Sequence, residues 1–136
     1  MLHPKRIVLI VDDSDDCSET LEVALHKLKD VEVAIVRTAE DALERLSKIN
    51  VAALITDLHL PRMNGLHLLA AIHAKKNGHT PPIIVISGDS DPRTPDRVLA
   101  AGAQAFFSKP YSPAAVRRKL EELLIASGRN GNGSSG

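Results

Sequence analysis

The sequence predicts a single α/β domain in which helices cover both faces of a parallel β-sheet. Five short apolar segments recur along the chain, at residues 7–11, 31–36, 51–56, 83–86 and 105–107. Stretches whose apolar residues have helical spacing separate these segments and follow the last one. Alternation of strand and helix requires crossover connections, and such connections make the strands that they join parallel.

The composition of the segments predicts where each strand lies in the sheet. Four segments are uninterrupted apolar runs, as expected for strands that are buried on both faces of a parallel sheet. The second segment differs because Glu32 and Ala34 separate Val31, Val33 and Ile35, which favours a position at an edge. We therefore expect a doubly wound, flavodoxin-like (βα)5 sheet with the strand order 2-1-3-4-5.

Each predicted helix has one apolar face, and several have recognisable ends. Thr38 and Ser112 are N-cap residues, and Gly128 is expected to end the last helix. The fourth helix is predicted to be short, about two turns between Thr94 and Gly102. The apolar faces of the other four helices consist, in chain order, of Leu21, Ala24, Leu25 and Leu28; of Ala39, Ala42, Leu43 and Leu46; of Leu66, Leu69 and Ile72; and of Val116, Leu120, Leu123 and Leu124.

Composition narrows the class of protein. The chain has 136 residues, and its 17 Lys and Arg balance its 17 Asp and Glu, which argues against a domain that binds nucleic acid through general charge. The single cysteine, Cys17, excludes a disulfide framework and a cysteine-based zinc site. No apolar run is long enough to span a bilayer and no signal peptide is readable, so we expect a cytoplasmic protein without membrane contact. We assign residues 1–127 to the domain and the Gly-, Ser- and Asn-rich residues 128–136 to a flexible tail or linker.

The polar residues that follow the strands form the candidate site. Asp12 and Asp13 follow the first strand, Asp57 the third, Ser87 the fourth and Lys109 the fifth. The carboxyl ends of parallel strands lie at one edge of the sheet, where ligands bind in doubly wound folds. Each residue alone has an ordinary structural explanation, as a turn residue, a carboxylate near a helix N-terminus or a solvated lysine. Their joint placement favours a functional site.

This set of side chains is suited to phosphoryl transfer onto an aspartate. Three close carboxylates repel one another and attract a cation, and oxygen ligands without a His or Cys cluster favour Mg²⁺. The metal would keep Asp57 ionised, so that its carboxylate can attack phosphorus and form an acyl phosphate. Mg²⁺, Lys109 and Ser87 would then each stabilise one of the phosphoryl oxygens.

Five short motifs resemble the receiver domain of response regulators in bacterial two-component signalling, and the chain is similar to the chemotaxis-type single-domain receivers. The motifs are Val11-Asp12-Asp13, Thr56-Asp57, Leu60-Pro61-Arg62-Met63-Asn64-Gly65, Ile86-Ser87-Gly88 and Ser108-Lys109-Pro110. The resemblance implies that Asp57 accepts a phosphoryl group from a phosphohistidine on a sensor histidine kinase or a histidine phosphotransfer protein. It also implies that Asp13, Asp57 and the backbone carbonyl of His59 bind Mg²⁺, with Asp12 assisting through water.

The same resemblance implies a conformational switch. Ser87 would move toward the phosphoryl group, and the aromatic ring of Phe106 would turn inward with it. The surface of the fourth helix, fifth strand and fifth helix would then contact a downstream protein target, and the Lys109-Pro110 peptide bond would be cis. Such a chain is a signalling domain and not a turnover enzyme, because its chemistry is limited to its own phosphorylation and dephosphorylation.

Some residues depart from the usual pattern of the family or narrow it. Phe106 stands where many relatives carry tyrosine, and Gly88 where alanine is common. His59 and Asp89 each lie two residues after a site residue, at positions where relatives tune the loss of the phosphoryl group. The resemblance thus implies that they affect the lifetime of the acyl phosphate, which the decay rates of labelled His59→Ala and Asp89→Ala proteins test.

Two other functions fit parts of the sequence. Asp13-Ser14-Asp15 resembles the first motif of haloacid-dehalogenase-type phosphatases, but in that family the nucleophile follows the first strand, and Asp57 would have no role. A pseudo-receiver, which binds partners without being phosphorylated, is the other alternative, although none of the acidic or lysine positions is missing. Turnover of a phosphate ester would favour the phosphatase, whereas stoichiometric labelling opposes it.

Overall fold

Strands and helices alternate along the chain, as predicted. The computed structural model describes residues 5–75 and 80–133. The strands are β1 Arg6–Val11, β2 Val31–Val36, β3 Val51–Asp57, β4 Ile83–Ser87 and β5 Ala105–Ser108. The helices are α1 Asp15–Leu25, α2 Ala39–Lys48, α3 Gly65–Ala74, α4 Thr94–Ala100 and α5 Pro113–Gly133. The predicted bounds of every strand agree with the structure to within one residue at each end.

The five strands form one parallel sheet in the order β2-β1-β3-β4-β5. This order confirms the doubly wound topology, and it also confirms that the segment with alternating polarity lies at an edge. The register aligns the carboxyl ends of the inner strands, since Val11 pairs with Thr56, and Asp57 pairs with Ile86. On the other side of β4, Ser87 pairs with Ser108. Residues that follow different strands are thereby brought to one edge of the sheet.

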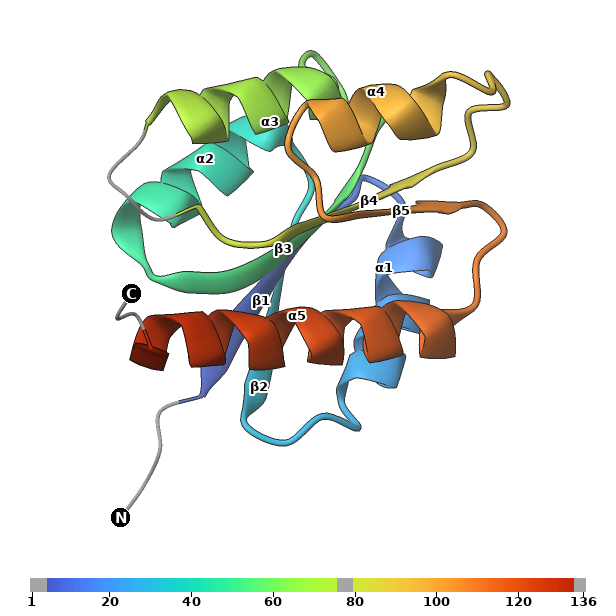
Figure 1. Ribbon diagram of the computed structural model, residues 1–136. Helices are drawn as coiled ribbons and strands as arrows, with labels where there is room; N and C mark the ends of the chain where they lie inside the picture. Colours follow the sequence, from blue (N-terminus) through green and yellow to red (C-terminus); the bar gives the residue numbers. More distant parts are fainter. Residues whose placement is uncertain (1–4, 76–79, 134–136) are drawn as a thin grey trace.

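Helices α2, α3 and α4 cover one face of the sheet, and α1 and α5 cover the other (Figure 1). Each face has its own core because successive strand residues point to opposite faces. Leu9 and Val11 of β1 pack beneath α2 and α3, whereas Val8 and Ile10 pack against α1 and α5. The inner strands are consequently apolar along most of their length, with polar residues only at their ends, which explains their uninterrupted hydrophobic runs.

The helix ends agree with the predictions at some positions and differ at others. Thr38 caps α2, accepting a hydrogen bond from the backbone N–H of Asp41 at 3.0 Å. Helix α4 has only 7 residues, as expected for about two turns. Helix α1 ends at Leu25, so Leu28 lies beyond it, in the turn before β2, and still packs against the α1 and α5 side of the core.

The predicted end of the last helix at Gly128 is wrong, because α5 continues to Gly133. A glycine in a helix costs only about 1 kcal/mol relative to alanine, which does not by itself stop a helix whose preceding turns are packed on a core. The structure thus assigns part of the predicted flexible tail to α5. Residues 134–136 of that tail lie outside the described residues.

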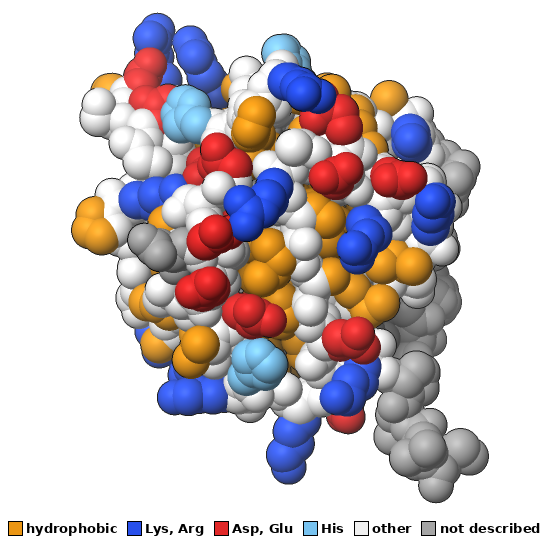
Figure 2. Space-filling model, turned by 180° about the vertical axis from the view of Figure 1, so that it is seen from behind, with side chains coloured by type: hydrophobic (Ala, Val, Ile, Leu, Met, Phe, Trp, Pro, Cys, Tyr) orange, Lys and Arg blue, Asp and Glu red, His pale blue; other side chains and the backbone are white. Residues whose placement is uncertain are grey.

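The surface carries charges of both signs. On the face seen from behind, Lys and Arg side chains lie among Asp and Glu side chains, with hydrophobic side chains showing between them (Figure 2). This intermixing is what a net charge of zero leads us to expect. In the part of the chain that the structure describes, none of the helices is long and apolar enough to cross a membrane.

Candidate functional site

Asp12, Asp57, Ser87 and Lys109 meet at the carboxyl edge of the sheet. Asp57 and Ser87 are the last residues of β3 and β4, while Asp12 follows β1 and Lys109 follows β5. The first three are buried, with 9%, 7% and 0% of their surface exposed. Burial of a polar group is unfavourable in free energy unless the group is hydrogen-bonded or paired with an opposite charge. The contacts of these residues therefore indicate the function of the site.

Asp57 is held by contacts to both of its carboxylate oxygens. Lys109 Nζ lies 2.6 Å from Oδ2, and the backbone N–H of His59 donates to Oδ1 at 2.9 Å. The carboxylate comes from β3 and the ammonium group from the residue after β5, although 52 positions separate them in the sequence. A hydrogen-bonded pair of this kind compensates the charge of a carboxylate that has little contact with water.

The contact with Asp57 determines the protonation of Lys109. Burial by itself would lower the pKa of this ammonium group, but the hydrogen bond and negative charge of Asp57, together with the charge of Asp12, outweigh it. The net result is a pKa above the usual value for lysine. Lys109 therefore stays positively charged at neutral pH and can stabilise negative charge on an oxygen next to Asp57.

The backbone around Lys109 is fixed by two features. The N–H of Lys109 donates to the carbonyl oxygen of Ser87 at 2.8 Å, which places the residue beside the end of β4. The Lys109-Pro110 peptide bond is cis, which confirms the expectation from the resemblance. The hydrogen bond connects the backbone of the lysine to the strand end that carries Ser87.

The surroundings of Asp12 favour a cation beside the acidic cluster. Burial, and to a lesser extent the nearby charges of Asp57 and Asp13, raises the pKa of Asp12 above its usual range, against the hydrogen bond that Ser14 N–H donates to Oδ1 at 2.8 Å. A positive ion near these oxygens would relieve the repulsion, and oxygen ligands of this type suit Mg²⁺. The donor chemistry therefore fits the predicted metal.

The geometry does not bring all the predicted metal ligands together. Asp13 is exposed, and among the described residues no three Asp, Glu, His or Cys side chains are close enough to form a metal cluster. The ammonium group of Lys109 lies against Asp57 instead. The assignment of Asp12, Asp13, Asp57 and the carbonyl of His59 as Mg²⁺ ligands stays a prediction.

Gly65 allows the chain to fold back on the residues that follow Asp57. A Cβ atom at this position would lie 2.9 Å from the Cα of Leu58 and 3.0 Å from the carbonyl oxygen of Asp57. The N–H of Gly65 donates to the carbonyl oxygen of Leu58 at 2.6 Å, and Asn64 caps α3 by accepting from His67 N–H. In the sequence this Asn-Gly pair is recognisable only through a motif, because the close approach that requires glycine is a tertiary contact.

Ser87 and the mouth of the site are linked through Asp89. The backbone N–H of Asp89 donates to Ser87 Oγ at 2.9 Å. The side chain of Asp89 points toward His59, with Oδ2 3.8 Å from Nε2. The structure thus brings together, at one opening, the two residues that the sequence places two positions after Asp57 and Ser87.

Phe106 lies on β5 and is half-buried. Its ring packs against the core beneath α2, α3 and α4, whereas its neighbours Ala105 and Phe107 face the core of the other side. The ring of Phe106 therefore lies on the same side of the sheet as α4. Its proposed movement with Ser87 stays a prediction.

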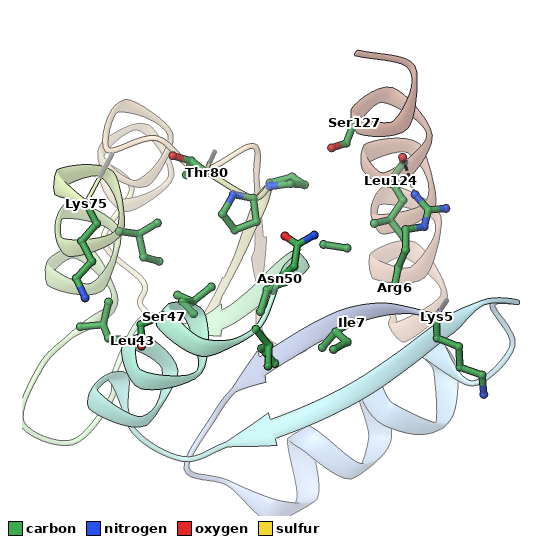
Figure 3. A pocket seen from close by; sticks show the side chains of 17 residues that line it. Lys5, Arg6, Ile7, Leu43, Ser47, Asn50, Lys75, Thr80, Leu124 and Ser127 are labelled. Carbon is green, nitrogen blue, oxygen red and sulfur yellow. Dashed lines mark hydrogen bonds between the residues drawn. The ribbon is translucent and has the colours of Figure 1, made fainter. Parts of the chain in front are cut away.

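A larger hollow than the one beside His59 and Asp89 lies at the amino edge of the sheet and has a volume of about 840 Å³ (Figure 3). Its cationic side chains are Lys5, Arg6 and Lys75, and none of its described lining residues is Asp or Glu. At one side of this hollow, Arg6 donates to the carbonyl oxygen of Leu124 at 3.1 Å (Figure 3). Without a carboxylate it lacks the nucleophile and the metal ligands that the sequence predicts.

Comparison with known proteins identifies the family to which the chain is similar. Residues 8–121 match the family of the response regulator receiver domain. A chemotaxis protein CheY homolog of Campylobacter jejuni is 31% identical over 118 residues, which are 86% of this chain and 91% of the relative. The two-component response regulator ORR7 of rice (Oryza sativa subsp. japonica) is 33% identical over 86% of this chain and 56% of its own length.

Solved structures resemble the fold in the same way. A putative response regulator from Chloroflexus aurantiacus superposes with a TM-score of 0.81 at 29% identity and covers 89% of this chain and 98% of its own. The receiver domain of the Francisella response regulator 1452 shares the fold, with a TM-score of 0.82 at 17% identity over 90% of this chain and 99% of its own. The chain belongs to the response regulator receiver domain family of two-component signalling.

Proposed function

We propose that the chain receives a phosphoryl group on Asp57 and changes conformation in response. The 2.6 Å contact between Lys109 Nζ and Asp57 Oδ2 carries this proposal, because it places a permanent cation beside a buried carboxylate. Receiver domains of this family are generally signalling domains that interact with histidine kinases or phosphotransfer proteins. The proposed donor is accordingly a phosphohistidine on such a partner, in the cytoplasm. The proposed receiver comprises residues 1–127 together with the part of α5 that continues beyond them.

The proposed reaction needs no proton transfer by the protein. A carboxylate oxygen of Asp57 attacks phosphorus, an O–P bond forms, and the P–N bond to the donor imidazole breaks with its electron pair leaving on nitrogen. Lys109 stabilises one phosphoryl oxygen, and Ser87 donates its hydroxyl hydrogen to another. Receiver domains generally bind Mg²⁺ at this acidic pocket. Held by Asp13, Asp57 and the backbone carbonyl of His59, with Asp12 assisting through water, the ion would supply charge neutralisation.

Acetyl phosphate tests the proposal directly, since it replaces the unknown partner as donor. We expect one added phosphoryl group by intact-protein mass, which appears with Mg²⁺ and is absent in chelator and in Asp57→Asn. Asp41→Asn is the matched control, because it neutralises an exposed carboxylate of α2 that lies outside the site. Labelling that survives Asp57→Asn would mean that another residue is the nucleophile.

The two alternative functions predict different results in the same experiment. A pseudo-receiver would bind Mg²⁺ or a partner without incorporating phosphate. A haloacid-dehalogenase-type phosphatase would release phosphate catalytically and would not depend on Asp57. Stoichiometric, self-limited labelling at Asp57 distinguishes the receiver from both.

A further inference from the structure

The loop between β4 and α4 is organised by its own carboxylates. Asp89 Oδ1 accepts the backbone N–H of Asp91 at 2.8 Å, and Asp91 Oδ1 accepts the backbone N–H of Arg93 at 2.9 Å. The guanidinium group of Arg93 returns to the carboxylate of Asp91 at 3.0 Å. Two consecutive turns closed by aspartate side chains give this loop a defined conformation.

Asp89 connects this loop to Ser87 through its backbone and to α4 through its side chain. Its N–H donates to Ser87 Oγ at 2.9 Å, and its Oδ2 accepts the hydroxyl of Thr94 at 3.1 Å. Thr94 is the first residue of α4 and is buried, with only 4% of its surface exposed. A buried hydroxyl that loses its acceptor is unfavourable, so the position of Asp89 is tied to that of α4.

We propose that Thr94 is a positioning residue, whose hydrogen bond to Asp89 holds Ser87 and the β4–α4 loop in the resting position. This inference rests on the proposed function, in which Ser87 moves toward a phosphoryl group on Asp57. When Ser87 moves, Asp89 N–H either follows it or loses its acceptor. When Asp89 follows, the Thr94 hydroxyl loses its own acceptor, and α4 has to adjust. The hydrogen bond between Thr94 and Asp89 therefore opposes phosphorylation, and breaking it changes the position of α4.

Removal of the Thr94 hydroxyl should favour the moved state. Thr94→Val keeps the shape of the side chain but cannot donate, and we expect the population of the moved loop to rise about fivefold to tenfold. The rate of labelling by acetyl phosphate should rise by up to the same factor, since the moved state is the one that accepts the phosphoryl group. Thr94→Ser restores the hydroxyl and should return both quantities toward those of the unchanged protein.

Amide hydrogen exchange measures how firmly the Thr94–Asp89 hydrogen bond holds the loop, without any phosphorylation. The Asp91 N–H, which donates to Asp89 Oδ1, should exchange several-fold faster in Thr94→Val and at the original rate in Thr94→Ser. Thr38→Val is the matched control, because it removes a different threonine hydroxyl, the cap of α2, and should leave Asp91 exchange and labelling unchanged. Thr94→Ala serves in place of the valine variant if that protein does not fold.

The outcomes separate this inference from the proposed function. Unchanged Asp91 exchange in the variants without the hydroxyl would overturn the inference, whatever the labelling result. Faster exchange of the Asp91 N–H with an unchanged labelling rate would also overturn the inference, because the Thr94–Asp89 hydrogen bond would then have no effect on phosphorylation. Absence of labelling in the unchanged protein would instead contradict the proposed function, and the exchange experiment would still decide whether Thr94 holds the loop.

Discussion

The two edges of this sheet differ in both volume and polarity. The amino edge has the larger of the two hollows, about 840 Å³, with walls of mixed polarity and the exposed cations Lys5, Arg6 and Lys75. A hollow at the carboxyl edge is smaller, about 130 Å³, but Asp57, Ser87 and Lys109 meet close by through short hydrogen bonds. The proposed chemistry lies where polar groups are buried and paired, and not in the larger of the two hollows.

This difference follows from how the elements connect. At the carboxyl edge the chain leaves four strands through residues that are held by hydrogen bonds, from Lys109 to Asp57 and from backbone N–H groups to Asp12 and Ser87. At the amino edge the helices end and the chain returns to the sheet, and the exposed charges there have solvent around them. Changes at the carboxyl edge should thus alter phosphorylation, whereas changes at the amino edge should alter stability alone.

Lys109→Met should have the largest effect on chemistry. It removes the cation beside Asp57, and loss of one preorganised donor typically slows a reaction about 100-fold to 1,000-fold. The time course of acetyl phosphate labelling by intact mass measures this change. Lys119→Met is the control, since it removes a lysine of α5 that pairs with Glu122 outside the site. A labelling rate within twofold of the unchanged protein would show that Lys109 does not stabilise the phosphoryl group.

Gly102→Ala, at the amino edge, should reduce stability and leave labelling intact. Gly102 has φ +110°, and an added Cβ would lie 2.6 Å from His73 Nε2, so we expect a loss of about 2–4 kcal/mol in the free energy of unfolding. Urea denaturation measures it. The matched variant at the other edge is Gly88→Ala, where the new Cβ would meet Lys109 Cβ at an ordinary 3.9 Å.

A second substitution separates the two causes of the Gly102 effect. His73→Ala in the Gly102→Ala background removes the ring contact but not the backbone strain, so it should recover only part of the lost stability. Full recovery would show that the positive φ costs nothing, and a defect in labelling would contradict the separation of the two edges.

The smallest expected effect is a shifted titration of Tyr111, which lies near the carboxyl edge. Burial, followed by the nearby charge of Cys17, raises the pKa of its phenol above the usual value of about 10. The folded state then retains this proton at pH values where the unfolded chain loses it, so the stability contributed by Tyr111 falls as pH rises from the unfolded pKa through the folded one.

This titration is easy to isolate because Tyr111 is the only tyrosine and the chain has no tryptophan. The tyrosinate absorbance should have its midpoint above 10 in the folded protein and near 10 in denaturant. Tyr111→Phe removes the signal and serves as the control. Equal midpoints in the two states would mean that the phenol is as solvated in the fold as in the unfolded chain.

Local patterns in the sequence were sufficient to predict the strands, the order of the sheet and the residues at its carboxyl edge. Uninterrupted apolar runs mark strands covered on both faces, and alternation in residues 31–36 marks the edge strand. Asp57, Ser87 and Lys109 could be placed together because parallel strands end at a common edge. Caps such as Thr38 are also local, since the hydroxyl and its donor are three residues apart.

Only the tertiary structure determined which of these groups touch and where the last helix ends. The need for glycine at Gly65 and Gly102 comes from Leu58 and His73, which pack against them. The bond between Thr94 and Asp89 depends on how the loop folds over the end of β4, and Gly128 stays inside α5 because the packed turns before it outweigh a weak helix former. Sequence spacing specifies period and capping, but contacts between distant residues depend on how complete elements pack, which no local pattern specifies.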